Sequence, residues 1–254
     1  MKDFWGIGGH EREPEGYFSW QHLVFVSSLM VIMVLLAVFF GVRNKNKDLK
    51  EKNKVLIWST VFIEAIYIFE LIFFPLRDDT SILYNLPLFL CSIQYVTIPL
   101  AAFSKGRLKE AALDIVFIFG ILSAVMGTYL AGNNYSTYPV ISVNNVASGL
   151  THIISGFASL YIVISGMESM KKENILISFA ILGAFCILAY IANVLLPYNY
   201  MFLMRPNETP YQIFYDLVNG NKVLYPIIVV LLFFVYISLY YLVYYAITKK
   251  KANK

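Results

Sequence analysis

The sequence predicts an all-α membrane protein, a polytopic bundle of seven transmembrane helices. The 254-residue chain is 59% hydrophobic and only 14% charged, whereas soluble domains average about a quarter charged residues. Its mean hydropathy of +0.65 agrees with a chain that lies largely in lipid. Seven stretches are long and apolar enough to cross a bilayer, since each helix needs about 20 such residues. These observations exclude a soluble globular domain.

The transmembrane domain is predicted at residues 19–247, after an N-terminal arm at 1–18. The arm is acidic where a cleavable signal peptide is basic, and the first apolar run is too long for a signal peptide. We place the spans at residues 19–42, 55–74, 82–103, 109–131, 143–166, 174–196 and 223–247.

The distribution of Lys and Arg predicts the orientation. Fifteen of the twenty lie in the loops 43–54, 104–110 and 167–173 and in the basic tail 248–254. Because positively charged loops stay in the cytoplasm, we expect the N-terminus outside and the C-terminus in the cytoplasm. Segment 197–222 then lies on the outer face. Its amphipathic stretch and prolines predict a cap on the membrane interface.

Ionisable side chains within the predicted spans are few, and each is a candidate functional group because charge in a bilayer is costly. Cys91 and His152 each lie about nine residues inside an inward-running span, and Glu64 lies about ten residues below the outer end of its span. At about 1.5 Å per residue, the three side chains share one depth near 14 Å. Glu70 and His22 lie closer to the outer face than these three residues. Asp114 lies at the cytoplasmic end of its span and is predicted to be an interfacial charge.

The neighbours of His152 predict that its side chain faces the interior of the bundle. Steps of three and four residues around it give a small, polar helix face, whereas the opposite face is apolar. Around Cys91 the face is partly polar, and Pro87 predicts a kink just above the thiol. The inward face at His152 consists of Asn145, Ser148, Gly149, Ser155, Gly156 and Ser159.

Two interpretations of the Cys91 and His152 pair follow from the residues. A cysteine in a span often behaves as a small hydrophobic residue, and a histidine there often joins helices by hydrogen bonds. Alternatively, a thiol and an imidazole at one depth form a nucleophile and its base.

Four segments of the chain resemble the YwaF-like family of bacterial integral membrane proteins. That family is related to the animal transmembrane-protein-164 acyltransferases and, more distantly, to the androgen-induced lipid hydrolases. The resemblance implies a catalytic cysteine at Cys91, a catalytic histidine at His152 and a bacterial plasma membrane as the location. Bacterial members often carry a histidine two residues before the cysteine, where this chain has Phe89. The segments are Tyr17–His22, Leu86–Cys91, the helix of His152 and Asn199–Leu203.

With this resemblance we expect covalent acyl transfer from a membrane phospholipid or another acyl lipid. His152 takes the proton of Cys91, Glu64 orients the imidazole, and Gln94 or Asn145 donates to the developing oxyanion. Water as the second nucleophile makes a lipid-ester hydrolase, and a lysolipid or headgroup alcohol makes a transferase. The remaining predicted residues support the site or line its substrate pocket: His22, Glu70, Ser148, Gly149, Gly156, Tyr67, Asn199 and Tyr200.

Two other function classes stay open. Glu64, Glu70 and His152 would suit a proton-coupled solute transporter, although the chain lacks the inverted repeat that many transporters show. In a non-catalytic structural protein, the same polar groups would only join helices. We expect no metal, cofactor or nucleic-acid partner, because the three histidines have no ligand spacing and the chain has no nucleotide-binding glycine pattern.

Overall fold

The computed structural model describes residues 2–207 and 209–252, and no strand occurs among them. Six of its helices are long and apolar enough to cross a membrane. The chain is therefore an all-α, multi-pass membrane protein, as the composition predicted. These helices are α2 Trp20–Asn44, α3 Leu49–Asp78, α5 Gly106–Tyr129, α7 Val143–Ser165, α8 Ile175–Leu195 and α10 Leu224–Ala252. Residues 253–254 of the predicted basic tail lie outside the described residues.

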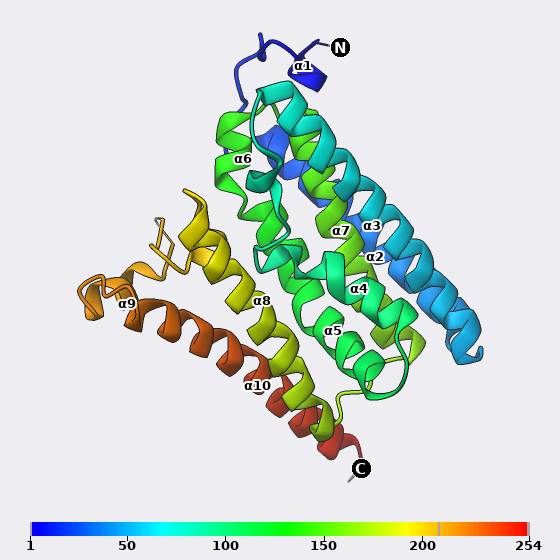
Figure 1. Ribbon diagram of the computed structural model, residues 1–254. Coiled ribbons are helices and arrows are strands. Elements are labelled where there is room, and N and C mark those ends of the chain that lie inside the picture. Colours follow the sequence, from blue (N-terminus) through cyan, green and yellow to red (C-terminus); the bar gives the residue numbers. More distant parts are fainter. Residues whose placement is uncertain (1, 208, 253–254) are drawn as a thin grey trace.

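Helix α7 lies in the middle of the bundle, packed against α5 and α2 and also touching α3 (Figure 1). Small residues allow this close packing. A Cβ added to Gly120 of α5 would lie 2.6 Å from Cβ of Ser159, and one added to Gly156 would lie 2.7 Å from Cβ of Ala124. The small face predicted for this helix is therefore its buried face.

The predicted third span, 82–103, is not one long helix. It forms the 3-10 turn η1, Ile82–Asn85, then an irregular stretch, the turn η2, Cys91–Ile93, and helix α4, Gln94–Phe103. Pro87 explains the break, because a residue before proline avoids the helical region and Leu86 has ψ 144°. The segment still carries the chain from the end of α3 to the start of α5 at the other end of the bundle (Figure 1).

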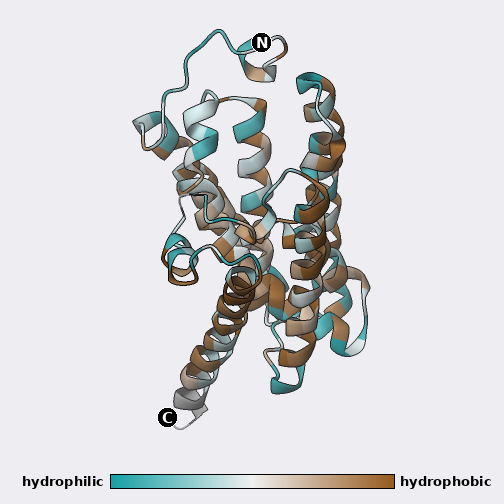
Figure 2. Ribbon diagram, turned by 60° about the vertical axis from the view of Figure 1, so that its left-hand side comes forward, coloured by the Kyte–Doolittle hydropathy of each residue, from teal (hydrophilic) through white to brown (hydrophobic). Residues whose placement is uncertain are grey.

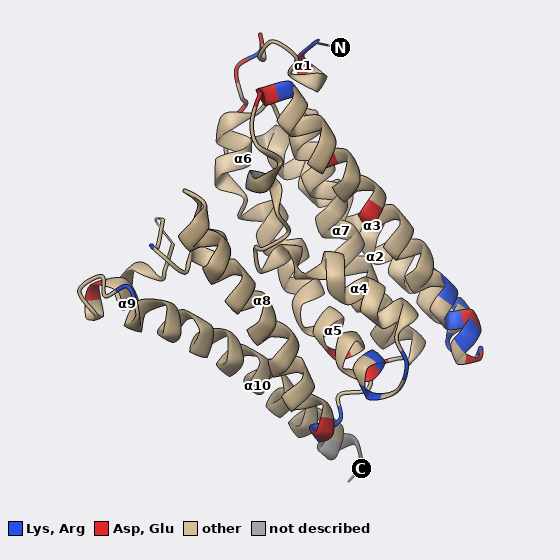
Figure 3. Ribbon diagram, in the orientation of Figure 1, with Lys and Arg blue, Asp and Glu red and all other residues tan. Residues whose placement is uncertain are grey.

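The two ends of the bundle differ in charge. Lys and Arg gather where α3 and α5 begin and near the start of α8, an end that we call the basic end (Figure 3). The N-terminal arm, which contains the short helix α1 Lys2–Trp5, covers the opposite end, which we call the arm end (Figure 1). Between the two ends the helices are largely hydrophobic (Figure 2). Helix α1 and the last turns of α10 lie at opposite ends of the molecule (Figure 1).

Asp114 at the basic end is not the interfacial charge that its position predicted. Its side chain is fully buried and accepts three hydrogen bonds, from the Met170 N–H at 2.7 Å, Asn174 Nδ2 at 2.9 Å and the Tyr241 hydroxyl at 2.8 Å. A buried carboxyl group requires such partners. Asp114 therefore connects α5, the loop before α8 and α10.

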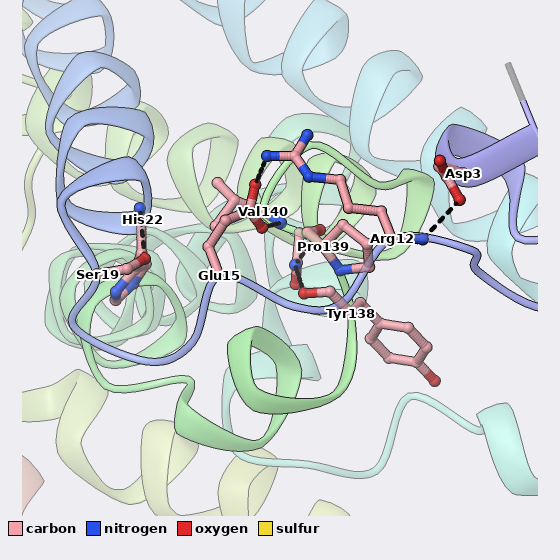
Figure 4. Close-up of polar contacts among 9 residues, drawn as sticks. Asp3, Arg12, Glu15, Ser19, His22, Tyr138, Pro139 and Val140 are labelled. Carbon is pink, nitrogen blue, oxygen red and sulfur yellow. Dashed lines mark hydrogen bonds and ion pairs between the residues drawn. The ribbon is translucent and has the colours of Figure 1, made fainter.

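The arm end is held by contacts between the arm and the loop that precedes α7. Glu15 accepts from the Val140 N–H at 2.8 Å and also pairs with Arg12 (Figure 4). Ser19 caps the start of α2 by accepting from the His22 N–H at 3.2 Å (Figure 4). The short helix α6, Gly132–Thr137, completes this end.

The segment between α8 and α10 contains the turn η4, Tyr200–Phe202, and the helix α9, Gln212–Leu217. The amphipathic stretch predicted within segment 197–222 is therefore helical. Asn193 of α8 holds the turn, since it donates to the Tyr200 carbonyl at 2.9 Å and accepts from the Tyr200 N–H at 2.6 Å. The Tyr200 hydroxyl donates to the Leu83 carbonyl at 2.9 Å, so this turn supports the segment that leads to Cys91.

Candidate functional site

A cavity of about 570 Å³ lies in the half of the bundle nearer the arm end. Its walls come from α3, α5, α7, segment 85–95 and residues near 198–202. Cys91 and His152, which lie 61 positions apart in the sequence, both line it. Met126 also lines the cavity and is 48% exposed, so the cavity reaches the surface of the molecule.

His152 is held by two residues of α5. Ser123 Oγ lies 3.0 Å from His152 Nδ1 and is hydrogen-bonded to it. A Cβ added to Gly127 would overlap the imidazole ring, so the absence of a side chain at this position makes room for His152. Among the described residues, the second ring nitrogen, Nε2, has no hydrogen-bond partner.

Cys91 is half-buried and stands at the start of a helical segment, Cys91–Phe103. The Ser92 N–H beside it already donates to the Phe89 carbonyl at 3.0 Å, so the start of this segment is tied to the residues that precede it. The irregular stretch around Pro87 places the thiol at a helix start rather than in mid-helix. No direct hydrogen bond joins Cys91 and His152 among the described residues, and the cavity connects them.

Glu70, not Glu64, is the carboxyl group at the cavity. The Tyr95 hydroxyl lies 3.1 Å from Glu70 Oε2 and 3.3 Å from Thr151 Oγ1, and all three residues line the cavity. The ring of Tyr67 packs on that of Tyr95, with centroids 4.5 Å apart. This cluster brings together α3, α4 and α7, so the predicted supporting residue Glu70 and pocket residue Tyr67 are both at the site.

We predicted that Glu64 orients the imidazole of His152, but the structure does not place it there. It does not line the cavity, and its Oε1 is buried without a hydrogen-bond partner among the described residues. A helix turns by about 100° per residue, so the six residues from Glu64 to Glu70 leave the two side chains about 120°, a third of a turn, apart around α3. Ser123 is the partner of His152 Nδ1 instead.

The two predicted oxyanion donors also lie away from the cavity. Gln94 is fully buried, and its Oε1 accepts from the Thr97 hydroxyl at 3.0 Å. Asn145 donates to the Pro139 carbonyl at 2.9 Å and so holds the loop before α7. The neighbouring Asn144 lines the cavity instead.

His22 is a structural histidine. Its Nδ1 accepts from the Phe18 N–H at 3.1 Å, its Nε2 lies 3.3 Å from the Thr128 carbonyl, and its ring stacks on Tyr135 at 3.9 Å. These contacts use both nitrogens, so the imidazole joins the arm, α2 and α5 and does not face the cavity.

Four residues predicted to line the pocket do not reach the cavity. Of the small, polar face predicted around His152 on α7, only Ser148 lines the cavity together with His152. Gly149 faces Leu29 of α2, and Gly156 faces Met33 of the same helix. Asn199 and Tyr200 stabilise the turn after α8; Asn199 donates to the Arg205 carbonyl at 2.7 Å. A helix face has two edges, and only one edge of this face reaches the cavity.

Phe89 lines the cavity as part of an aromatic cluster. Its ring centroid lies 5.2 Å from that of Tyr200 and 6.2 Å from that of Phe202. At this position the chain therefore carries an aromatic packing residue. The polar character of the cavity comes from other lining residues: Asn85, Ser92, Asn134, Asn144, Ser148 and Thr151.

Sequence reasoning missed Ser123 and Gly127. They lie four residues apart, on one face of α5, and both are small residues within an apolar span. That spacing was the available signal, because positions i and i+4 share a helix face. Only the packing of α5 on α7 shows that this face meets His152.

Residues 17–244 match the sequence model of the TMEM164 family. The chain belongs to the TMEM164 family. The match contains five of the six long helices completely and most of the sixth, α10. It also contains both Cys91 and His152. No curated protein and no solved structure matches the chain. Membership of the TMEM164 family agrees with the multi-pass membrane architecture, and the arm before residue 17 lies outside the match.

Proposed function

We propose that this member of the TMEM164 family is a lipid acyltransferase or lipid-ester hydrolase, with Cys91 as nucleophile and His152 as base. The observation that carries the proposal is the common cavity of these two side chains in a membrane-spanning bundle. A thiol attacks an ester carbonyl only as the thiolate, so a base that reaches the same space is required.

In the proposed reaction, a lipid ester enters the cavity and His152 Nε2 takes the proton from Cys91 Sγ. The bond from Sγ to the acyl carbon forms, and the bond from that carbon to the ester oxygen breaks. His152 then gives the proton to the departing alcohol. Water or a lipid hydroxyl group next attacks the thioester, its proton passes through His152, and the Cys91 thiol is restored.

Three amide side chains line the cavity as candidate donors to the developing oxyanion, those of Asn85, Asn134 and Asn144, and we choose Asn144 because a charged partner holds it. Arg77 Nη1 donates to Asn144 Oδ1 at 2.7 Å, and this contact fixes the amide so that Nδ2 remains for a ligand. Asn144 also lines the cavity. A fixed donor in a partly desolvated site is the usual means of stabilising such a charge.

The proposed orientation has the arm end outside and the basic end in the cytoplasm, with segment 82–103 as a seventh crossing. It follows from the concentration of Lys and Arg at the basic end (Figure 3). The cavity then opens within the outer half of a bacterial plasma membrane, and the lipid substrate comes from the outer leaflet. We also propose that the chain is related to the YwaF-like family and, more distantly, to the androgen-induced lipid hydrolases.

The test uses purified protein in lipid nanodiscs with a phospholipid labelled in its acyl chains. We expect a hydroxylamine-sensitive acyl group on the wild type that Cys91→Ala abolishes. His152→Ala should slow its formation by at least about 100-fold, the usual weight of a general base. Cys186→Ala is the matched control, because this buried thiol contacts Met201 Sδ at 3.9 Å and lies outside the cavity.

Equal turnover in the wild type and in both site variants would contradict the proposal. A solute flux that depends on Glu70 but not on Cys91 would instead support a transporter. The two outcomes separate because only the acyltransferase or hydrolase forms a thioester.

A further inference from the structure

Ser123 lies beside the ring nitrogen of His152 at which a catalytic histidine usually has an orienting partner. It lies on α5, is 4% exposed, and its Oγ is 3.0 Å from His152 Nδ1 across the interface between α5 and α7. A base that acts through one ring nitrogen needs the other nitrogen held, since that contact fixes both the ring and the tautomer.

The chemistry of the pair determines which atom must carry the hydrogen. A serine hydroxyl group both donates and accepts, so a distance of 3.0 Å alone is compatible with either direction. His152 acts as a base through Nε2 only if that nitrogen has a lone pair, which requires the hydrogen to be on Nδ1. Ser123 Oγ is then the acceptor of Nδ1–H.

Gly127 limits the ring from a second side. It follows Ser123 by one helical turn, and its missing side chain leaves the space that the imidazole fills. The ring therefore lies between a hydrogen-bonding hydroxyl group and a backbone surface. A rotation that broke the contact with Ser123 would have to move the ring away from this space.

The interface that carries Ser123 is closely packed one to two turns further along. Ser159 Oγ of α7 donates to the Phe117 carbonyl of α5 at 2.8 Å, and Gly120 lies against the same residue. These contacts set the distance between α5 and α7 and so the position of Ser123 relative to His152.

No carboxyl group takes the place of Ser123. Glu64 is outside the cavity, and Glu70 is engaged by the Tyr95 hydroxyl. Among the described residues, neither forms a hydrogen bond or ion pair with His152. We propose that Ser123 is the positioning residue of this site and holds His152 as the Nδ1–H tautomer, with Nε2 free to accept the proton of Cys91. The catalytic role of Ser123 rests on the proposed function, but the tautomer of His152 is testable separately.

The test is a nitrogen NMR spectrum of the full-length protein in nanodiscs with ¹⁵N-labelled histidine, and His152→Gln identifies the His152 signals. We expect the wild type to show one His152 tautomer, with the hydrogen on Nδ1. Ser123→Ala should give a mixture of tautomers. Ser178→Ala is the matched control, because it also removes a buried hydrogen bond between two helices, to the Tyr241 hydroxyl, but lies outside the interface between α5 and α7, so it should leave the His152 signals unchanged.

Turnover gives the second readout. Ser123→Ala should lower kcat about tenfold or more with KM little changed, and Ser123→Thr, which keeps a hydroxyl group, should recover most of the rate. A wild-type His152 protonated on Nε2, or an unchanged spectrum in Ser123→Ala, overturns the inference. Because the spectrum does not depend on turnover, an inactive protein with the expected tautomer would contradict the proposed function alone.

Discussion

The imidazole of His152 occupies the space in which a side chain at Gly127 would lie. A Cβ added to this glycine would overlap Cε1, Nε2 and Nδ1 of the ring. The two residues come from α5 and α7, so the position of the candidate base depends on the packing of two helices. This relationship gives the first prediction.

Gly127→Ala should displace the His152 ring and reduce acyl turnover by about 100-fold, because a small misplacement of a catalytic group has effects of this size. The fold should persist, since only a side chain has to move. Gly183→Ala is the control, because a Cβ there would meet Phe234 at an ordinary 3.7 Å. Turnover assays and thermal unfolding measure the two effects, and an active Gly127→Ala protein would contradict the assigned position of the ring.

Tyr95 and Glu70 should be energetically coupled. Their hydrogen bond of 3.1 Å joins α4 to α3 at the cavity, and such a bond contributes about 1 kcal/mol. A double-mutant cycle with Tyr95→Phe and Glu70→Gln, measured by thermal unfolding, should give a coupling energy of about that size. Exactly additive effects of the two substitutions would mean that the contact is not formed in the membrane. As a control, Tyr95→Phe combined with the distant Ser178→Ala should be additive.

Asn193→Ala should destabilise the turn that follows α8. It leaves the N–H of buried Tyr200 without a partner, a loss that costs about 1–3 kcal/mol, and it removes one of the two hydrogen bonds to the Tyr200 carbonyl, which also accepts from the Leu203 N–H at 3.2 Å. Because the Tyr200 hydroxyl supports the Leu83 carbonyl, the segment before Cys91 should also become more accessible. Hydrogen exchange of residues 82–91 measures this effect. As a control, Asn133→Ala at an exposed position should change neither the stability nor the hydrogen exchange of residues 82–91. Equal exchange in Asn193→Ala and Asn133→Ala would refute the link between the turn and the segment before Cys91.

The fold of the N-terminal arm should loosen in acid through Asp3. The backbone N–H groups of Glu11 and Arg12 donate to its carboxylate at 2.7 and 3.1 Å and hold the pKa of Asp3 below its ordinary value of 3.8. A lowered pKa in the folded state stabilises the arm above the ordinary pKa, and this contribution is lost as the pH falls through the lowered value.

The amide signals of Glu11 and Arg12, followed by NMR from pH 6 to pH 2, report this transition. We expect a change only below about pH 4, and none in Asp3→Asn, in which the arm should already be loosened at neutral pH. A transition of the same midpoint in Asp3→Asn would assign the effect to another group.

The sequence alone determined the membrane class and most of the helices. Runs of apolar residues exclude water-soluble folds whatever the packing, and the six long helices fall within a few residues of six predicted spans. The inward face of the His152 helix was also predictable, because side-chain size along a helix reports which face other helices approach. The sequence predicted a common depth for Cys91 and His152, and both line one cavity.

Tertiary structure decided the direction in which each side chain points and what it meets. The depth of Glu64 was a matter of counting residues, but its rotation about α3 turned it away from the cavity and brought Glu70 there. Pro87 changed a predicted span into a turn followed by a short helix, because a proline and the residue before it do not continue a helix. Ser123 and Gly127 had no visible role until α5 was packed on α7, since a contact between two helices depends on both of their rotations at once.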